Sequence, residues 1–252
     1  MKYIWLTGAS SGIGAQLAEQ LLAQGHVLAL SARNVEALDE IAQRWPKRVL
    51  VLAGDLSEPQ QVQTIIRAIN CEWGKLDQVI LNAGTCEYID AAHFEAAMVE
   101  RVMRANLLSA AYCVEAALPL LRRSKCAHLV AMSSSVTFLA LPRAAAYGAS
   151  KAALRYLFES LRIDLAHEEI SVTLISPGFV DTPLTQRNDF PMPMRWSANK
   201  AAQYIANRLD KKPLEIRFPR PFICTLRLLG CLPARWQLAL GKRLARPSQG
   251  SL

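Results

Sequence analysis

Short apolar runs alternate along the chain with longer segments in which apolar residues recur every three or four positions. The runs predict buried strands, and the spaced apolar positions predict amphipathic helices. Strands that alternate with helices throughout, without a repeat or a linker, favour one α/β domain built on a doubly wound, mostly parallel sheet. The seven expected strands are residues 2–7, 26–31, 49–53, 79–81, 127–132, 170–175 and 214–218.

The expected helices lie between these strands. The helix after the first strand should end just before Gly25, and Asn34 is the expected N-cap of the next helix. Ser57 and Gln60 have the spacing of a capping box for the helix that follows them. Later helices are expected at about 91–121, 146–166 and 197–209, with a covering loop at 184–197.

Polar or glycine-rich clusters follow six of the seven expected strands. Ligands of doubly wound sheets bind beyond the carboxyl ends of the strands, so we expect these clusters to share one site. Their common position is stronger evidence for a ligand site than any single motif. The clusters begin at Thr7, Arg33, Asp55, Asn82, Ser134 and Pro177.

The first cluster contains three glycines between a strand and a helix. Glycine lets the backbone approach a ligand closely, and the free amides at a helix start can face a phosphate. An ordinary turn is the alternative, which the flanking strand and helix disfavour. The pattern therefore predicts a pyrophosphate-binding loop. Its expected contact residues are Gly8, Ser10, Ser11, Gly12, Ile13 and Gly14.

The end of the second strand distinguishes two dinucleotides. An acid there binds the 2′-hydroxyl of NAD, whereas an arginine suits the 2′-phosphate of NADP. This chain has Ala32 followed by Arg33. The missing acid argues against NAD more firmly than Arg33 argues for NADP(H), because a solvated surface arginine is an equally ordinary reading. Asp55, after the third strand, is expected either to bond an adenine amino group or to shape a turn.

Three residues near the fifth strand have the chemistry of a proton-transfer site. If Tyr147 opens a helix, Lys151 lies one turn later on the same face. An ammonium beside a phenol favours the phenolate, and the hydroxyl of Ser134 can bond the same reacting oxygen. Asn106 is a polar residue among apolar helix positions. It is expected to clamp the backbone, to take part in catalysis, or both.

Composition narrows the class of protein. The 252 residues are 52% hydrophobic and 20% charged, which indicates a globular chain. The six cysteines form no Cys-x-x-Cys pair and the four histidines are scattered, so we expect reduced cysteines and no metal site. The first apolar run is too short for a signal peptide, and no run approaches the length of a membrane span. A cytoplasmic location is expected.

The formal net charge of +8 comes entirely from the end of the chain. Residues 1–210 contain 20 basic and 20 acidic residues, whereas residues 211–252 contain nine basic residues and one acid. The body of the protein is therefore neutral, and the final segment is basic.

The basic segment also has apolar residues near helical spacing, among them Phe222, Leu226 and Trp236. Pro221 and Pro233 should begin two short helices. Two alternatives remain open: packing of these helices on the body or a partner subunit, which is slightly favoured, and peripheral contact with an anionic membrane. Nucleic acid is disfavoured, because the basic residues lie among large apolar ones instead of in a polar stripe.

Taken together, the motifs resemble those of the short-chain dehydrogenase/reductase family. The matches span residues 2 to about 218 and, as an ordered set, are highly specific. They are Thr-Gly-x-x-x-Gly-x-Gly at 7–14, Asn-Ala-Gly at 82–84, Asn106, the spacing from Ser134 to Tyr147, Tyr-x-x-x-Lys at 147–151 and Pro-Gly-x-x-x-Thr at 177–182. The family often has Asn where this chain has Leu81, a departure of little weight.

The resemblance implies a role for each matching residue. Tyr147 would be the general acid/base, Ser134 would orient the substrate oxygen, and Asn106 would hold a water in a proton relay. Lys151 would bond the nicotinamide ribose and depress the tyrosine pKa. Among the three adjacent serines 133–135, only the family spacing selects Ser134. Further cofactor contacts would come from Arg33, Asp55, Leu56, Asn82, Ala83, Gly84, Pro177, Gly178, Val180 and Thr182, besides Tyr147 and Lys151.

The resemblance also implies a single-domain Rossmann fold at 1–218, with 219–252 as a basic amphipathic extension of that domain. The expected function is an NADP(H)-dependent oxidoreductase that interconverts an alcohol and a carbonyl, assembled as a homodimer or homotetramer. Residues 136–146 would form an apolar substrate wall that includes Phe138, so the substrate is expected to be apolar near the reacting carbon. The alternative is a catalytically silent NADP(H)-binding sensor or scaffold.

Overall fold

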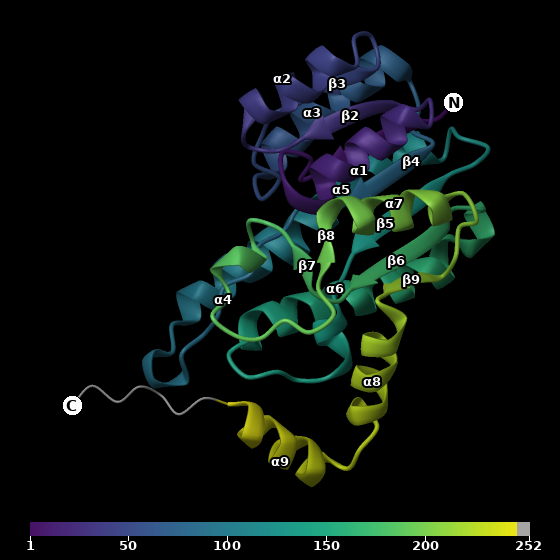
Figure 1. The fold of residues 1–252 in the computed structure, drawn as a ribbon. Helices are drawn as coiled ribbons and strands as arrows, with labels where there is room; N and C mark the ends of the chain where they lie inside the picture. Colours follow the sequence, from purple (N-terminus) through teal and green to yellow (C-terminus); the bar gives the residue numbers. More distant parts are fainter. Residues whose placement is uncertain (246–252) are drawn as a thin grey trace.

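Seven parallel strands form one central sheet in the computed structural model, which describes residues 1–245 (Figure 1). The strand order is β3-β2-β1-β4-β5-β6-β9. The order reverses between β1 and β4, and such a reversal opens a ligand crevice at the carboxyl ends of the strands. The strands are β1 (Tyr3–Thr7), β2 (Val27–Ser31), β3 (Val49–Val51), β4 (Gln78–Leu81), β5 (His128–Met132), β6 (Ser171–Pro177) and β9 (Glu215–Phe218).

Helices cover both faces of the sheet, which explains why the strands are continuous apolar runs. One face packs against α1 (Gly12–Ala23), α2 (Val35–Arg44) and α7 (Ala198–Leu209). The other face packs against α3 (Pro59–Trp73), α5 (Ser109–Leu121) and α6 (Ala145–Asp164). The predicted α/β fold with a doubly wound seven-stranded sheet is therefore confirmed.

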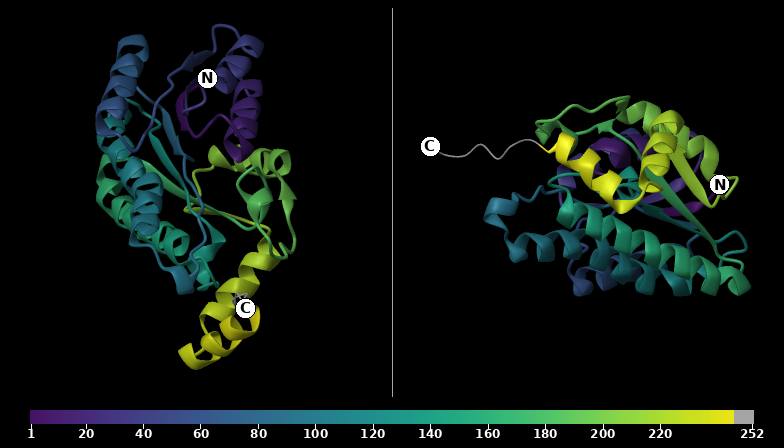
Figure 2. Two further views of the ribbon diagram at one scale, coloured as in Figure 1. Left: turned by 90° about the vertical axis from the view of Figure 1, so that its left-hand side faces the viewer. Right: turned by 90° about the horizontal axis from the view of Figure 1, so that it is seen from below.

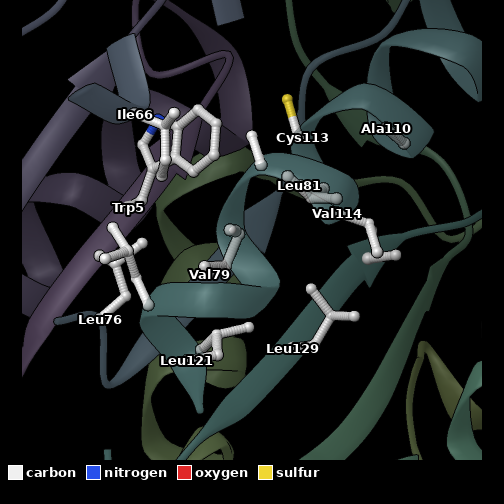
Figure 3. Packing of buried hydrophobic residues seen from close by; sticks show 14 of the residues in the cluster. Trp5, Ile66, Leu76, Val79, Leu81, Ala110, Cys113, Val114, Leu121 and Leu129 are labelled. Atoms are coloured by element: carbon white, nitrogen blue, oxygen red, sulfur yellow. The ribbon is translucent and has the colours of Figure 1, made fainter. Parts of the chain in front are cut away.

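Side chains alternate between the two faces along each central strand, as the pleat requires. In β4, Val79 points to the α3–α5 face and Ile80 points to the α1–α7 face. Figure 3 shows Val79 and Leu129, from β4 and β5, in the same buried cluster as Cys113 and Val114 of α5. The indole nitrogen of the fully buried Trp5, on the same face, donates a hydrogen bond to Ser31 Oγ at 3.0 Å.

The region expected as one helix at 91–121 is broken into pieces. A short 3₁₀ turn (Ala91–His93) precedes α4 (Ala96–Met103), and a π-helical turn (Arg104–Leu108) separates α4 from α5. Asn106 lies at the centre of this π-helical turn. Such turns are rare in helices and are frequent at functional sites. Periodicity alone does not reveal the turn, because one extra residue barely changes the apolar spacing.

Local helix signals had mixed outcomes. Asn34 caps α2, its side-chain oxygen accepting from Ala37 N at 3.0 Å, and Gly25 follows α1 with a φ of +91°. The predicted capping box of Ser57 and Gln60 is wrong. The helix α3 starts at Pro59, whose fixed φ suits the first helical position, and Ser57 Oγ instead donates to Asp55 at 2.7 Å.

The segment expected as a covering loop contains unpredicted structure. A 3₁₀ turn (Thr185–Arg187) follows β7 (Val180–Asp181), which pairs with β8 (Trp196–Ser197) in a small second sheet. The Trp196 ring stacks on Phe218 with centroids 5.1 Å apart. Two more 3₁₀ turns complete the body, Ser135–Phe138 and Leu165–Glu168.

The basic segment forms α8 (Arg220–Gly230) and α9 (Ala234–Leu244), close to the starts predicted from Pro221 and Pro233. Both helices lie at the end of the molecule reached by the carboxyl end of β9 (Figure 1). The last part of the predicted extension, residues 246–252 with Arg246, lies outside the described residues.

Candidate active site

A cleft of about 740 Å³ runs along the carboxyl ends of the strands. It brings together residues that lie after six different strands in the sequence. All of the predicted catalytic and cofactor-binding residues line it except Gly14 and Asn106. The predicted residues in the lining are Gly8, Ser10, Ser11, Gly12, Ile13, Arg33, Asp55, Leu56, Asn82, Ala83, Gly84, Ser134, Tyr147, Lys151, Pro177, Gly178, Val180 and Thr182.

The glycine loop is shaped by backbone conformation and by close packing. Gly8 and Gly12 have φ of +65° and +55°, in the left-handed region that side chains disfavour. Gly14 faces away from the cleft and lies against the loop itself: a Cβ there would be 2.0 Å from the Gly8 carbonyl oxygen. Gly14 thus allows α1 to pack on the loop, and it does not line the cleft.

Thr7 and Asn82 tie the glycine loop to β4. Thr7 Oγ1 accepts from the backbone amides of Asn82 and Ala83 at 3.0 and 3.1 Å. The Asn82 side-chain amide in turn donates to the carbonyl oxygens of Thr7 and Gly8 at 3.1 and 3.0 Å. These bonds hold the two central strand ends at the switch point. Thr7 was in the sequence motif, but its structural role was not predicted.

Arg33 and Asp55 lie at the end of the cleft formed by β2 and β3. The Asp55 carboxylate accepts from the Ser57 amide and hydroxyl at 2.9 and 2.7 Å. These hydrogen bonds, together with the charge of Arg33, lower the pKa of Asp55. Asp55 is therefore a turn residue that also lines the cleft. Arg33, in the same end of the lining, is exposed and free to meet an anionic group of a ligand.

Ser134 and Tyr147 are hydrogen-bonded to each other. Tyr147 lies in the first turn of α6, as predicted, and Ser134 precedes the 3₁₀ turn after β5. Ser134 Oγ also accepts from the Val136 amide at 3.2 Å, which fixes the hydroxyl in place. The neighbouring Ser133 hydroxyl is buried without a hydrogen-bond partner among the described residues. Of the three adjacent serines, Ser134 is the one joined to the tyrosine.

Burial and the nearby Cys86 thiol raise the pKa of Tyr147, and the hydrogen bond with Ser134 offsets this only in part. The spacing of Tyr147 and Lys151 predicts the opposite direction, a pKa lowered by the ammonium. The Lys151 ammonium is 6.0 Å from the centre of the tyrosine ring and donates to the Met132 carbonyl oxygen at 2.8 Å. Burial is therefore the largest influence on the pKa of the phenol.

Lys151 itself is buried, and this burial lowers its pKa to about 8. A carbon atom on Gly84 would lie 3.3 Å from the Lys151 nitrogen and 2.8 Å from Asn106 Oδ1. Gly84 therefore leaves the space that both polar side chains occupy.

The lowered pKa of Lys151 predicts a pH-dependent stability. An unfolded lysine keeps its proton to about pH 10, so between the two pKa values the unfolded chain binds more protons and stability rises with pH. Relative to Lys151→Met, the wild-type free energy of unfolding should increase by about 2 kcal/mol between about pH 7 and about pH 10. Urea unfolding at several pH values measures this. The exposed Lys125, replaced by Met, is the control; a flat or falling difference for Lys151→Met would contradict the assignment.

The Asn106 side chain uses its polar atoms within the protein. Its carbonyl oxygen accepts from the Thr85 amide at 2.7 Å, and its amide donates to Thr85 O and Ser150 Oγ, both at 2.9 Å. The side chain therefore clamps the segment after β4 to α6, one of the two roles the sequence left open. A relay role stays a prediction.

The predicted substrate wall does not line the cleft. None of residues 135–146 does so, and Phe138 lies between the guanidinium groups of Arg155 and Arg227, at 4.8 and 5.8 Å. The aromatic residues near Tyr147 come from elsewhere. Phe190 makes edge contacts with Tyr88 at 5.5 Å and with Phe179 at 6.0 Å.

Tyr88 connects these aromatic residues to Tyr147. Burial, contact with Cys86 and the nearby Tyr147 raise its pKa. Tyr88 was not predicted, because the Asn-Ala-Gly motif after β4 ends at Gly84 and no motif marks the residues that follow it. The covering loop is held by the ion pair of Arg143 with Asp189 at 3.0 Å, so Arg143 is engaged within the protein.

Several cleft residues were also missed by the sequence analysis. They belong to the segment that follows the Asn-Ala-Gly motif and to the start of the helical region, where no further motif gives a signal. Arg101 pairs with Glu87 at 3.0 Å across this side of the cleft. The unpredicted residues from this region are Thr85, Glu87, Arg101, Arg104, Ala105 and Ser109.

The described residues, 1–245, contain neither a metal-binding cluster nor a helix that could cross a membrane. Within residues 1–245, no cluster of His, Cys, Asp or Glu is arranged to hold a metal ion. In the same part of the chain, every helix is too short or too polar to cross a membrane.

Known proteins are similar to this chain in sequence and in fold. The family described as short chain dehydrogenase matches residues 2–191. An uncharacterized oxidoreductase of Myxococcus xanthus is 35% identical over 96% of this chain and 90% of its own length. The 11-beta-hydroxysteroid dehydrogenase 1A of Arabidopsis thaliana is 37% identical over 75% of this chain. The matched region is 55% of that relative's length.

Solved structures agree with the architecture. A short-chain dehydrogenase from Streptomyces avermitilis has a TM-score of 0.84 at 23% identity, covering 96% of this chain and 97% of its own. The RhlG/NADP active-site complex of Pseudomonas aeruginosa has a TM-score of 0.80 at 28% identity, covering 88% and 96%. With the family match extending over most of the sequence and the strand-end cleft in place, this chain belongs to the short-chain dehydrogenase family.

Proposed function

We propose that the protein is an NADP(H)-dependent oxidoreductase that interconverts an alcohol and a carbonyl. The observation that carries this is the hydrogen-bonded pair of Ser134 and Tyr147, with the buried Lys151 one helical turn away, in the cleft that contains the glycine loop. Two structural relatives support the choice of cofactor. They are described as the RhlG/NADP complex and an archaeal alcohol dehydrogenase complexed with 5-hydroxy-NADP.

The cleft suits a dinucleotide. The left-handed glycines Gly8 and Gly12 let a pyrophosphate approach the start of α1, whose first amides have no partner within the helix. Asn82, Ala83 and Gly84 would lie along the ribose and nicotinamide, and Thr182 would bond the carboxamide. When bound, the nicotinamide supplies or accepts the hydride.

Side chains of the cleft would donate or accept the proton of the reaction. With its pKa raised, Tyr147 keeps its proton at neutral pH and can donate it to the oxygen of a carbonyl substrate. Ser134 holds the same oxygen by a hydrogen bond. Lys151 contributes a positive charge close to the phenol, and the Met132 carbonyl fixes its position. In the reverse direction, Tyr147 would accept the proton of an alcohol.

Arg33 should determine the preference for NADP(H) over NAD(H). Replacing Arg33 by Ala should raise the KM for NADPH about 10- to 100-fold and leave the KM for NADH unchanged, because a charge-assisted bond to the 2′-phosphate contributes about 1.5–3 kcal/mol. Steady-state kinetics with both cofactors measure this. The exposed Arg67 of α3, replaced by Ala, is the matched control. An unchanged ratio of kcat/KM for the two cofactors would remove Arg33 from the site.

We further propose an apolar substrate. Tyr88, Phe179 and Phe190 are not in the cleft lining itself, but they form a continuous aromatic group at its border. Tyr88 brings this group close to Tyr147, and an apolar carbon skeleton would suit such a border. Hydroxysteroid dehydrogenases among the relatives agree with this class, although the matched region is about half the length of those proteins.

The competing hypothesis is a silent NADP(H)-binding sensor or scaffold. A sensor needs no proton donor, and the assembled pair of Ser134 and Tyr147 therefore favours the enzyme. A panel of apolar ketones and aldehydes, monitored by NADPH absorbance, separates the two. Tight cofactor binding without turnover of any of them would support the sensor.

We also propose a homodimer or homotetramer. Along α6, Tyr156 and Ile163 are large and well exposed. An exposed apolar helix face is typical of a subunit interface, and multi-angle light scattering would measure the assembly.

A further inference from the structure

The basic extension divides into one helix that is packed and one that is not. Ile223 and Leu226 of α8 are buried, and a Cβ on Gly230 would lie 2.1 Å from the Phe138 carbonyl oxygen, so α8 packs closely on the body. The helix α9 buries none of its residues. Figure 2 shows both helices projecting beyond the rest of the molecule, with α9 farthest out. Of the two alternatives left open by the sequence, packing on the body describes α8. The helix α9 is tied to the end of α8 by hydrogen bonds from Gln237 to Gly230 O and Leu232 O, and it leaves most of its surface exposed.

Large apolar side chains of this helix pair are exposed to solvent. Trp236 and Leu244 are 60% and 54% exposed, and Leu228 of α8 is 70% exposed. Trp236, Leu240 and Leu244 are spaced four residues apart, so they form one stripe along α9. Exposed apolar side chains gathered on one element indicate an interaction surface.

The charge of the pair is uniformly positive. Residues 220–244, which span both helices, contain five arginines and lysines and no acid. The preceding acid, Glu215, is already ion-paired with Arg155 and accepts from Ser176 Oγ at 2.6 Å. The helix pair therefore carries uncompensated positive charge beside its apolar stripe.

A recess of about 700 Å³ at the base of α8 extends this charge onto the body. It lies between the end of α7, the edge strand β9 and α8. Five cationic side chains from these elements line it, and its one acidic residue is Glu215. The five are Arg208, Lys211, Arg217, Arg220 and Arg227.

The mixture of cations with tryptophan and leucine selects among the partners for such a surface. A second copy docking by the same helices would bring like charges together, which opposes association. A nucleic acid would engage the cations through its phosphates but would leave the exposed leucines without an apolar partner. An anionic bilayer accepts both features, because tryptophan and leucine enter the interface while arginine and lysine meet the lipid phosphates.

We propose that α8 and α9 form a binding surface for an anionic phospholipid bilayer, with the Trp236–Leu240–Leu244 stripe in the interface and the flanking cations at the phosphates. This surface is separate from the cleft, and it does not depend on the proposed oxidoreductase activity. It adjoins the 3₁₀ turn after Ser134, since α8 packs against Phe138.

Vesicle co-sedimentation of the full chain tests the proposal. The protein should sediment with vesicles of equal parts phosphatidylcholine and phosphatidylglycerol, and stay in solution with phosphatidylcholine alone. The triple substitution Arg235→Glu, Lys242→Glu, Arg243→Glu should weaken binding by about 100-fold or more, since each cation near such a surface contributes about tenfold or somewhat less. Added salt should weaken wild-type binding as well.

A matched variant distinguishes binding by the surface of α8 and α9 from binding that depends only on the net charge of the protein. Lys47→Glu, Arg67→Glu, Lys125→Glu changes the net charge equally at exposed positions outside α8 and α9, and it should bind like the wild type. Equal loss of vesicle binding in both triple variants would overturn the proposal. So would absence of wild-type binding at low salt, or binding of inositol hexaphosphate with no binding to anionic vesicles. Circular dichroism verifies that the variants are folded.

Tryptophan fluorescence reports the predicted contact directly. Trp236 is one of five tryptophans in the chain. Anionic vesicles should shift the emission of the wild type to shorter wavelength and leave that of Trp236→Phe unshifted. An equal shift in both proteins would place the contact elsewhere. Light scattering that detects loss of an oligomer in the α9 triple variant, with vesicle binding unchanged, would assign the surface to a second copy instead.

Discussion

Replacing Tyr147 by Phe should lower kcat by about 10³-fold, within the 10²- to 10⁴-fold range of general acid catalysis. The substitution removes one oxygen atom, and it is the oxygen that Ser134 bonds and that would donate the proton. The aromatic ring remains, so the cleft keeps its shape and the Kd for NADPH should change by less than about threefold. Stopped-flow and steady-state measurements of NADPH oxidation, with equilibrium titration of the cofactor, test both parts.

Tyr156→Phe is the matched control for this variant. Tyr156 lies on the same helix, α6, but in its middle and not in the first turn, which contains Tyr147. Its side chain is 77% exposed. It should keep wild-type kcat. If Tyr147→Phe turned over a carbonyl substrate within a factor of a few of the wild type, another group would be the proton donor.

Replacing Gly14 by Ala should destabilise the protein by about 3 kcal/mol or more, at the upper end of the cost of overpacking. The new Cβ would lie 2.0 Å from the Gly8 carbonyl oxygen and 2.5 Å from the side-chain nitrogen Nδ2 of Asn82. Both neighbours are held in place by hydrogen bonds, so α1 must move away from the loop. For a chain of this size the Tm should fall by about 6–12 °C. Calorimetry measures this, and NADPH affinity should fall with it.

Gly241→Ala provides the matched control. Gly241 lies in α9, and a Cβ there would meet no atom within 4 Å. Since alanine favours a helix over glycine by about 1 kcal/mol, this variant should be at least as stable as the wild type. If Gly14→Ala unfolded at the wild-type temperature, the close packing of α1 on the glycine loop would be incorrect.

The secondary-structure pattern was accessible from the sequence because its signals are local. Strands buried on both faces are continuous apolar runs, and seven such runs became the seven strands of the sheet. The strand ends are equally local, and the residues after them reached one cleft because parallel strands share a carboxyl edge. Asn34 capped its helix for the same reason. Ser57 did not, because Pro59 two residues later suited the helix start better.

The electrostatics of the site could not be derived in this way. The spacing of Tyr147 and Lys151 on one helix predicted that the ammonium would lower the phenol pKa. The pKa of Tyr147 is raised instead, because neighbouring segments bury the phenol and bring the Cys86 thiol close to it. The aromatic contact of Tyr88 with Phe190 could not be predicted either, because the two rings come from loops that are distant in the sequence.

The sequence by itself determined the α/β architecture, the glycine loop and the order of the polar clusters, because periodicity, backbone freedom and strand direction are properties of short segments. Only the tertiary structure decided what each polar or apolar side chain faces. Asn106 became a clamp because Thr85 and Ser150 lie against it. The two helices of the basic extension have similar patterns, yet α8 is packed on the body and α9 is exposed. Burial depends on which remote segments cover a residue, and that information is absent from its local sequence.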